Sequence, residues 1–555
     1  MNNCPFRPLK RSRMRFIASC ALALVLAACT TGPDYQRPSL DAPANYKSAT
    51  DAEAAQPRLG QDWWRLFQDP DLDALAKEAL GANQNLKAAM ARVAQARASV
   101  LSVKSSFFPV VTLDPAATRS RTPAPNVQSD SLSSKLAQVS SVIGQVSTVA
   151  NQANTLAQGG TLTPTTGGNK QTGGSSAGTA ASATTSNRFQ IPFDLSYEID
   201  IWGRVRRSYE AAQAQTQVSV YDLEVVRQTL LADLARNYFN LRSLDAQQQI
   251  LERNLALYQE QVDLTGNQYK AGLINETNLL QAQVQLETTR AQAADTQRQR
   301  TDLEHAIAIL LGRAPAQFTL EARPLAATPQ AASDAAGPPA IPAGLPSDLL
   351  RRRPDVAEAE QNLVGACAEI GVAKADFFPA IKLTGSAGLQ SADLQNVLDW
   401  QNRTWSIGPS ISLPIFKGGQ LRANLEKAKA RYDELEATYR NSVLNAFRDV
   451  EDSLTDLHAR ADEAGARGKA AASAREYLRL TQIQYQTGVI DYLQVVNAEQ
   501  TLLTNELSEA QVLNERIAST LLLIKALGGG WESESSLAAK EAEPSDTPRE
   551  TANKG

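Results

Sequence analysis

The sequence has few of the side chains that carry out catalysis or bind metal ions. Its 555 residues include only two histidines, His305 and His458, and each stands on a predicted helix without a second imidazole at ligand spacing. The chain has no Gly-x-Ser-x-Gly elbow, no phosphate loop ending in Gly-Lys-Ser/Thr and no zinc pattern. Acidic residues such as Asp449, Glu451 and Asp452 fall on a helix face and are most simply solvated charge. We therefore predict that the protein is not an enzyme and holds neither a metal nor a cofactor.

Cysteine is also scarce. The four cysteines are Cys4, Cys20, Cys29 and Cys367, and the first two lie in the leader described below. The mature chain is therefore expected to have no internal disulfide and no cysteine-based metal site. A net charge of −4 gives no electrostatic reason to bind nucleic acid. Aromatic residues are sparse, whereas alanine, glutamine and leucine are abundant, as expected for a protein of long helices.

Beyond the leader, the sequence has no run of 18 apolar residues, so no transmembrane helix is predicted. The leader, residues 1–28, consists of a basic stretch and an apolar stretch of secretory length. It ends in Leu26-Ala27-Ala28-Cys29, which resembles the bacterial lipobox, where the cysteine is lipidated and becomes the N-terminus. An ordinary cleavage site with a chance cysteine is the alternative. On the lipobox interpretation, Cys29 anchors the chain to the outer membrane, and residues 29–60 form an extended segment.

One long stretch, from Arg204 to Ala271, contains no proline and a single interior glycine, Gly266. Apolar residues recur in it at intervals of seven, in two rows offset by three or four. The rows are Leu234, Leu241, Leu255, Val262 and Tyr269, and Leu230, Leu244, Leu251 and Tyr258. Two such rows predict a helix that is buried lengthwise against other helices. At a rise of 1.5 Å per residue, this helix would be roughly 100 Å long.

The long stretch occurs twice, because the chain is a tandem duplication. Gln268–Ile274 is matched 216 residues later by Gln484–Ile490, and Phe107-Phe108-Pro109 is matched 270 residues later by Phe377-Phe378-Pro379. The first copy therefore carries 54 extra residues upstream of its long helix. They include residues 159–186, a run of glycine, serine, threonine and alanine that is predicted to be disordered.

The duplication sets the expected domain boundaries. The first repeat, residues 61–320, is predicted to contain a helical region that opens at Trp63, runs towards Leu101 and includes a helix over 85–103. A hairpin within 107–200, the long helix 204–271 and a return helix over 277–311 follow. The second repeat, residues 345–531, is predicted to contain a helix over 355–374, a hairpin within 378–416, the long helix 420–486 and a return helix over 491–527. Residues 321–344 link the repeats, and the tail 532–555 is expected to be disordered.

Each repeat also contains alternating strands. The apolar face of residues 189–200 carries Phe189, Ile191, Phe193, Leu195, Tyr197 and Ile199, and that of the second copy carries Trp405, Ile407, Ile411, Leu413 and Ile415. Weaker partners at 110–113 and 381–389 complete one hairpin per copy. Strands of about 10 residues that are apolar outside and polar inside are typical of a transmembrane β-barrel. A half-buried strand pair in a soluble sheet shows the same alternation, but a secreted, lipid-anchored chain without further strands favours the barrel.

Four strands cannot close a barrel, because an unpaired backbone N–H or C=O in lipid costs several kcal/mol. Two chains would give eight strands and an interior filled by side chains, whereas three would give twelve strands and a lumen. We therefore predict a homotrimer that is mainly α-helical, with a membrane β-barrel that continues directly into a helical tube.

Taken together, these segments resemble the TolC/OprM family of trimeric outer-membrane factors, most closely the NodT-type efflux lipoproteins. The motifs that carry the resemblance are Gly32–Pro38, Leu345–Asp355, Phe377-Phe378-Pro379 and the two Tyr-x-x-Gly segments. The resemblance, which covers roughly Cys29 to Trp531, implies a 12-stranded β-barrel in the outer membrane, continuous with a 12-helix periplasmic α-barrel. It also implies docking through a periplasmic adaptor protein onto an inner-membrane RND-type pump, and passive export of drugs or other small solutes.

The resemblance assigns a role to the turns after the two long helices, which in the family close the pore and contact the adaptor. Those positions are Tyr269 and Gly272 in the first copy, and Tyr485 and Gly488 in the second. Glycine there also suits a helix end that needs a positive φ.

One feature of these turns departs from the family. Family members often place aspartates six or nine residues after the second glycine, where this chain has Gln494 and Asn497. The first copy has Asn278 and Gln281 at the equivalent places. Neutral amides at the aperture would bind cations less and respond less to salt than a ring of carboxylates.

Two other functions stay open from the sequence. A type I protein-secretion duct would share the same architecture, and a structural coiled-coil lipoprotein would need the helices but no pore. The second alternative does not explain a strand hairpin at the same point of each repeat. The lipobox and the NodT-like segments favour efflux, and no residue identifies the cargo.

Overall fold

The computed structural model describes residues 31–40, 43, 45–48, 59–122, 184–325, 339, 341 and 346–531. The leader, Cys29, nearly all of the insert, most of the linker and the tail 532–555 lie outside the described residues, so the expectations for these segments stay predictions. The free cysteine of the described chain, Cys367, is buried.

Both repeats contain the predicted helices, with ends within one residue of the expected positions. In the first repeat they are α4 (Gln84–Lys104), α6 (Arg204–Lys270) and α7 (Glu276–Leu310), and in the second α9 (Pro354–Ala375), α10 (Gln420–Gln486) and α11 (Tyr492–Ala526). The heptad rows of α6 are largely buried, with Leu234, Leu241 and Leu251 fully enclosed. Lengthwise packing of this helix is therefore confirmed.

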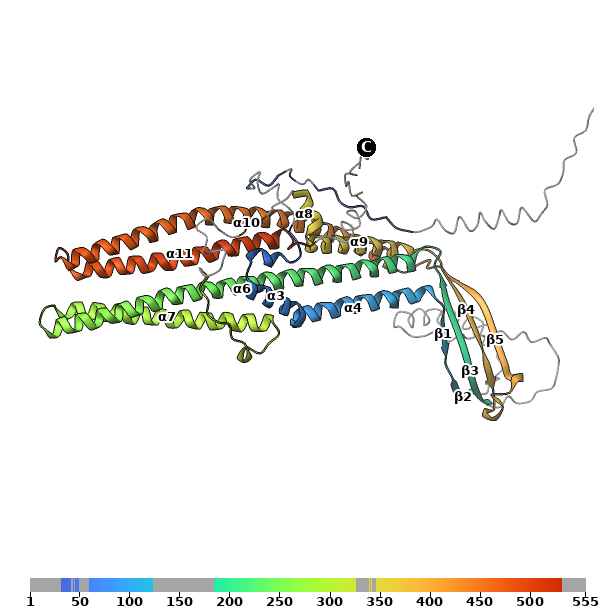
Figure 1. Ribbon diagram of the computed structural model, residues 1–555. Helices are drawn as coiled ribbons and strands as arrows, with labels where there is room; N and C mark the ends of the chain where they lie inside the picture. Colours follow the sequence, from blue (N-terminus) through green and yellow to red (C-terminus); the bar gives the residue numbers. More distant parts are fainter. Residues whose placement is uncertain are drawn as a thin grey trace, which may run out of the picture. The chain divides into compact units, whose positions relative to one another are not determined.

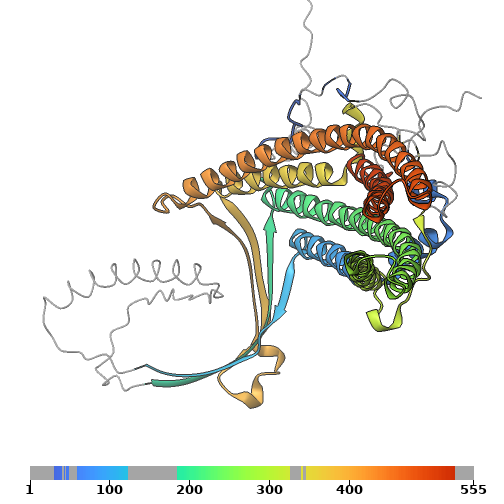
Figure 2. The same ribbon diagram turned by 90° about the vertical axis from the view of Figure 1, so that its left-hand side faces the viewer.

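The helices form one curved layer with four helix positions. α6 contacts α4 and α7 on one side and α9 and α11 on the other, and α10 contacts α9 and α11. The pair α4 and α7 therefore fills one position end to end, and the pair α9 and α11 fills another, beside two helices that run the full length (Figure 1, Figure 2). Each repeat supplies one long helix and one composite position.

The first helical region, predicted from Trp63 towards Leu101, consists of several helices. It divides into η1 (Trp63–Phe67), α3 (Pro70–Ala82) and α4. Gln68 has a left-handed backbone with φ +50°, and Asp69 then begins α3 by accepting two hydrogen bonds from backbone N–H groups of the first turn. Asn83 leaves the helical conformation (φ −58°, ψ 130°) and caps α4 in the same way. A short helix, α8 (Pro346–Arg352), precedes α9 at the equivalent point of the second repeat.

The two composite positions are joined by equivalent contacts. Asn83 donates a hydrogen bond from Nδ2 to the carbonyl oxygen of Leu310 at the end of α7 (2.8 Å). Arg353 occupies the same place in the second repeat and donates from Nη1 to the carbonyl oxygen of Ala526 at the end of α11 (3.4 Å). In each composite position, the side chain at the start of one helix thus donates a hydrogen bond to a carbonyl group at the end of the other helix.

A glycine after each return helix allows this close approach. Gly312 and Gly528 have φ values of +70° and +90°. A Cβ atom would lie 2.7 Å from the carbonyl oxygen of Ala82 at the first position and 2.0 Å from that of Arg352 at the second. Both the backbone conformation and the available space exclude a side chain.

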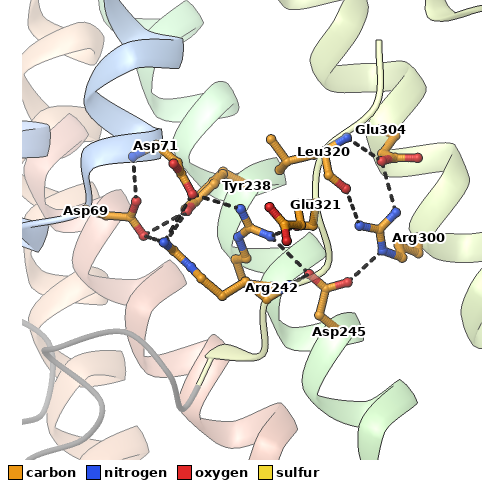
Figure 3. A network of polar contacts seen from close by, with 10 residues as sticks. Asp69, Asp71, Tyr238, Arg242, Asp245, Arg300, Glu304, Leu320 and Glu321 are labelled. Carbon is orange, nitrogen blue, oxygen red and sulfur yellow. Dashed lines mark hydrogen bonds and ion pairs between the residues drawn. The ribbon is translucent and has the colours of Figure 1, made fainter.

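A buried polar network links α3, α6 and α7 near the first of these joints (Figure 3). Tyr238 of α6 donates a hydrogen bond to Asp69 (2.8 Å). One turn further along α6, Arg242 pairs with Asp245 (3.2 Å), which also accepts from Nε of Arg300 on α7 (2.6 Å). Because the side chains of Arg242 and Asp245 are 1% exposed, removing either partner would cost about 3–5 kcal/mol.

The described part of the N-terminal segment is extended, as expected, and lies along the helices. Asp34 pairs with Arg207 of α6 (2.7 Å), and Tyr35 donates a hydrogen bond to Glu360 of α9 (3.3 Å). Further along, the backbone N–H of Lys47 donates to Glu451 of α10 (2.6 Å). The segment therefore holds three helices of the layer together.

The sheet contains five strands instead of the four predicted. They are β1 (Val110–Leu113), β2 (Ala116–Thr122), β3 (Thr184–Ile199), β4 (Ala380–Ser391) and β5 (Arg403–Ser412). β1 and β2 both pair antiparallel with β3, with Val110 opposite Ser196 and Ala116 opposite Gln190. β1 and β2 therefore occupy a single strand position in the sheet, which is interrupted at residues 114–115. The order across the sheet is β1-β3-β4-β5, so four strand positions remain.

Two details of the strand prediction are wrong. Residues 184–186, assigned to the disordered insert, are the first residues of β3, where they pair with β2. Leu413 and Ile415, assigned to the second apolar strand face, lie beyond the end of β5 at Ser412. Pro414 lies between them and has no N–H group to donate to a strand ladder, which explains the early end.

The chain divides into two compact units that do not follow the repeats. One unit contains the helices of both repeats, and the other contains residues 109–198 and 382–410 with the strands of both. Each repeat therefore contributes to both units. Among the described residues, no helix is both long and apolar enough to cross a membrane.

The joints predict a large effect of a small substitution. Gly528→Ala introduces left-handed strain and a contact with the Arg352 carbonyl, so we expect it to lower the free energy of unfolding by at least about 2 kcal/mol. Gly465→Ala is the matched control, because Gly465 lies inside α10 with open space at its Cβ position, and alanine there should stabilise by about 1 kcal/mol. Thermal melts of the detergent-solubilised protein, followed by circular dichroism, measure both. A Gly528→Ala protein that melts at the wild-type temperature would contradict the role of the joint.

Candidate functional site

The two turns at the far ends of the long helices have the backbone geometry that their glycines predict. Gly272 has φ +73°, and Gly488 has φ +76°. In the first turn the N–H of Leu273 donates to the carbonyl of Gln268 (2.9 Å), and in the second the N–H of Val489 donates to that of Gln484 (2.9 Å). This is the glycine-dependent helix end known as a Schellman motif, and it reverses the chain within a few residues.

Apolar side chains stand exposed at the apex of both turns. Leu273 is 74% exposed and Val489 is 71% exposed, and the ring of Tyr269 is also exposed. Apolar residues gathered at an exposed chain reversal are typical of a protein-binding surface.

The two turns are held differently. In the second turn the Tyr485 ring lies against that of the buried Tyr492 on α11, with ring centroids 5.9 Å apart. The carboxylate of Asp491 caps α11 by accepting from the N–H of Gln494 (3.3 Å). In the first turn Asn275 begins α7 without a side-chain cap. The second turn is therefore tied down by side chains that the first lacks.

The chain brings together only some of the residues predicted to form the gate. The Tyr485 ring packs against Tyr492 within the second turn, whereas the side chains of Tyr269, Gln494 and Asn497 are exposed. Gln494 and Asn497 are three residues apart and share one face of α11, while Val495 and Ala498 are buried. The amides thus face out of the single chain, as a gate shared among several chains requires. The lipid-attachment residue Cys29 lies outside the described part of the chain.

Two acids of α11, the buried Glu506 and the half-buried Glu499, were not predicted. Glu506 of α11 is 6% exposed and pairs with Arg253 of α6 and with Arg475 of α10 (3.1 Å). One carboxylate therefore connects the two long helices through a return helix. The sequence contains a signal for it, because Glu499 and Glu506 follow Tyr492 at intervals of seven and so occupy the buried row of α11.

Glu499 differs from Glu506 because no cation of the described chain pairs with it. Burial raises the pKa of Glu499 from its ordinary 4.5 to about 7. The titratable groups that interact with it are Tyr258 on α6 and Tyr492 on α11 itself. Burial, with the neighbouring acids Glu499 and Glu506, raises the pKa of Tyr258 to about 12, although the nearby amide of Gln285 acts in the opposite direction. This part of the helix layer therefore holds an uncompensated acid close to the turns.

Comparison with known proteins identifies the family. A family model described as outer membrane efflux protein matches residues 161–313 and 345–529, which is more than half of the chain. The chain belongs to this family. The two matched ranges fall one in each sequence repeat, so the duplication is visible in the family model as well.

Individual relatives agree over nearly the whole length. The chain is 30% identical over 520 residues to the solvent efflux pump outer membrane protein SrpC of Pseudomonas putida, covering 92% of this chain and 97% of that one. It is 28% identical over 516 residues to the cation efflux system protein CusC of Escherichia coli O6:H1, covering 92% and 98%. The solved structure of the outer-membrane channel OprN matches with a TM-score of 0.75 at 29% identity, covering 91% of this chain and all of that one.

These findings confirm three predictions made from the sequence. The protein is an outer membrane efflux protein, it has the fold of the solved outer-membrane channels, and it is located in the outer membrane. The roles of individual residues at the turns stay predictions, as does lipid attachment at Cys29.

The half-buried acid Glu499 predicts a pH-dependent stability of this efflux protein. Because the packed chain raises the pKa of Glu499, packing is favoured while the carboxyl is protonated. This contribution is fully present below about pH 4.5, falls as the pH rises to about 7, and stays lost above it. Glu499→Gln, which is neutral at every pH, should match the wild type at pH 4.5 and exceed it at pH 8 by an amount on the order of 1–3 kcal/mol.

Thermal melts at pH 4.5, 6 and 8 measure the difference. Glu287→Gln, on the exposed surface of α7, is the matched control and should show no such trend. An advantage of Glu499→Gln that is equal at pH 4.5 and pH 8 would show that the carboxyl does not titrate in this way.

Proposed function

We propose that three copies of the chain form a passive duct that exports small solutes delivered by a separate inner-membrane pump. The observation that carries the proposal is that both layers of the chain end in open edges. The sheet order leaves β1 with β2 at one edge and β5 at the other, and the helix layer ends at α4 with α7 and at α10. Four strand positions and four helix positions per chain give twelve of each in a trimer.

Physical chemistry supports closure by copies of the same chain. In lipid, an open strand edge leaves N–H and C=O groups without partners, at a cost of several kcal/mol each. At the edges of the helix layer, large apolar side chains are exposed on the single chain. They include Leu101 on α4, Leu280, Val284 and Ile309 on α7, and Leu444 on α10. A ring of three chains covers both kinds of edge with one symmetry operation, whereas a structural coiled-coil lipoprotein has no use for the sheet.

The turns are proposed to serve two purposes in this assembly. Their exposed apolar apex, with Leu273 and Val489, supplies a surface for a periplasmic adaptor, and the amides of Gln494 and Asn497 line the aperture. The pump to which the adaptor connects is proposed to be of the RND type. The relatives named above differ in the solutes their names give, cations for CusC and solvents for SrpC, so membership of the family does not fix the cargo.

Conductance tests the aperture. Tyr485→Phe removes a hydroxyl from the tied second turn, and Gln494→Ala removes an amide from the proposed aperture. We expect both variants to keep the heat-modifiable trimer on gels and to raise the single-channel conductance in planar bilayers, because each removes a polar group from the proposed constriction. Tyr477→Phe, an exposed tyrosine two turns back along α10, should change nothing. Unchanged conductance in both test variants would exclude these residues from the gate.

Crosslinking tests the adaptor contact. A photoreactive amino acid at position 273 or 489 is expected to capture a periplasmic protein in cells, because both side chains protrude from the turns. The same group at position 444, which is exposed on α10 but proposed to face a neighbouring copy, should capture this chain instead. Capture of this chain from all three positions would contradict adaptor binding at the turns. It would not contradict the proposed trimer.

A further inference from the structure

The connection between β4 and β5 folds into a compact unit. It contains two short helical turns, η5 (Leu394–Asn396) and η6 (Trp400–Asn402). The side chain of Asn402 donates from Nδ2 to the carbonyl of Asn396 (2.6 Å), and the N–H of Asp399 donates to the same carbonyl (3.1 Å). Val397 is buried inside it. The connection therefore has a defined shape and is not an open loop.

This compact unit exposes large apolar side chains. Leu394 is 66% exposed, Leu398 74% and Trp400 75%, although the backbone around them is held by hydrogen bonds. Nothing in the described chain covers them. Exposed apolar side chains on a fixed surface indicate a binding partner that is itself apolar.

The register of β5 identifies that partner. Side chains alternate along the strand, so Arg403, Trp405, Ile407 and Ile411 share one face, and the polar Thr404, Ser406 and Ser410 share the other. In an outer-membrane channel the apolar face meets lipid and the polar face meets the lumen. Trp400 of the connection, which contacts Arg403, thus lies next to the end of the lipid-facing column.

The length of β5 sets the level at which this column ends. Its ten residues extend about 33 Å along the strand, or about 25 Å across the membrane at the usual tilt, which is the height of the apolar band of such proteins. Arg403 therefore lies at the boundary between hydrocarbon and headgroups. Its guanidinium is 5.2 Å from the centre of the Trp400 ring and donates from Nη1 to the Trp400 carbonyl (3.0 Å). Tryptophan and arginine at that boundary are typical of membrane-interface anchors.

We propose that the β4–β5 connection is a membrane-interface anchor, in which Leu394, Leu398 and Trp400 insert among the outermost lipid chains and Arg403 binds an anionic headgroup. The anchor fixes the depth of the sheet in the bilayer. It is independent of the adaptor contact and of the gate, so failure of either proposal leaves the other standing.

Fluorescence quenching in vesicles tests the insertion. The full-length protein with Leu398→Cys or Gln401→Cys, labelled with an environment-sensitive fluorophore, is reconstituted into phosphatidylcholine–phosphatidylglycerol vesicles; the labelled wild type gives the background from its own cysteines. Gln401 is the matched control because it is exposed on the same connection and polar. We expect lipids brominated near the headgroup to quench the label at 398 at least about twofold more than the label at 401, and aqueous iodide to show the reverse.

Two outcomes would overturn the proposal. Equal quenching of both labels by iodide would place the connection in water. Protection of position 398 from both quenchers would place it against a neighbouring chain.

The charge of Arg403 is tested separately in unlabelled protein. The wild type should melt at a higher temperature in vesicles that contain phosphatidylglycerol than in pure phosphatidylcholine. Arg403→Gln should abolish this difference and Arg403→Lys should restore most of it. A difference that persists in Arg403→Gln would assign the lipid effect to another residue.

Discussion

The helix layer depends on two places where the end of one helix meets the beginning of another. Each long helix must be matched along its whole length, but the chain supplies only shorter helices for the positions beside it. Gly312 and Gly528 allow the return helices to end directly against the next segment, and Asn83 and Arg353 satisfy the carbonyl groups left there. Without this arrangement the layer would have a gap at mid-height, and the long helices would lose the buried rows that make them stable.

Much of this architecture could be predicted because it rests on periodic sequence. The heptad rows gave the long helix to within one residue, and the repeated glycines located both turns. The two-residue period gave the strands, but not their ends, because Pro414 and residues 114–115 interrupt pairing locally. The cause of the break at Asn83 is not visible in the sequence, since asparagine and alanine at that point do not stop a helix by themselves. It exists because the end of α7 occupies the space, which is a tertiary contact.

The buried charges were the least predictable part of the molecule. Arg242 and Asp245 lie beside the apolar rows of α6 and would be assigned to a solvated face by pattern alone, yet each is almost fully enclosed. Their partners, such as Arg300, come from distant parts of the chain, so local residue spacing does not predict the network. The inward position of Glu499 and Glu506 is predictable in principle, because both residues follow Tyr492 at intervals of seven on α11. Heptad rows were traced only along the long helices.

The unequal support of the two turns has a consequence for how many molecules can bind to them. The proposed trimer would present six turns that only a threefold axis relates, since the Tyr485–Tyr492 contact and the Asp491 cap exist in one turn of each chain and not in the other. A ring of identical partner molecules on that trimer would therefore meet two alternating kinds of turn, one held by side-chain contacts and one without them. Three partners could all bind alike; six would have to adopt two distinct conformations.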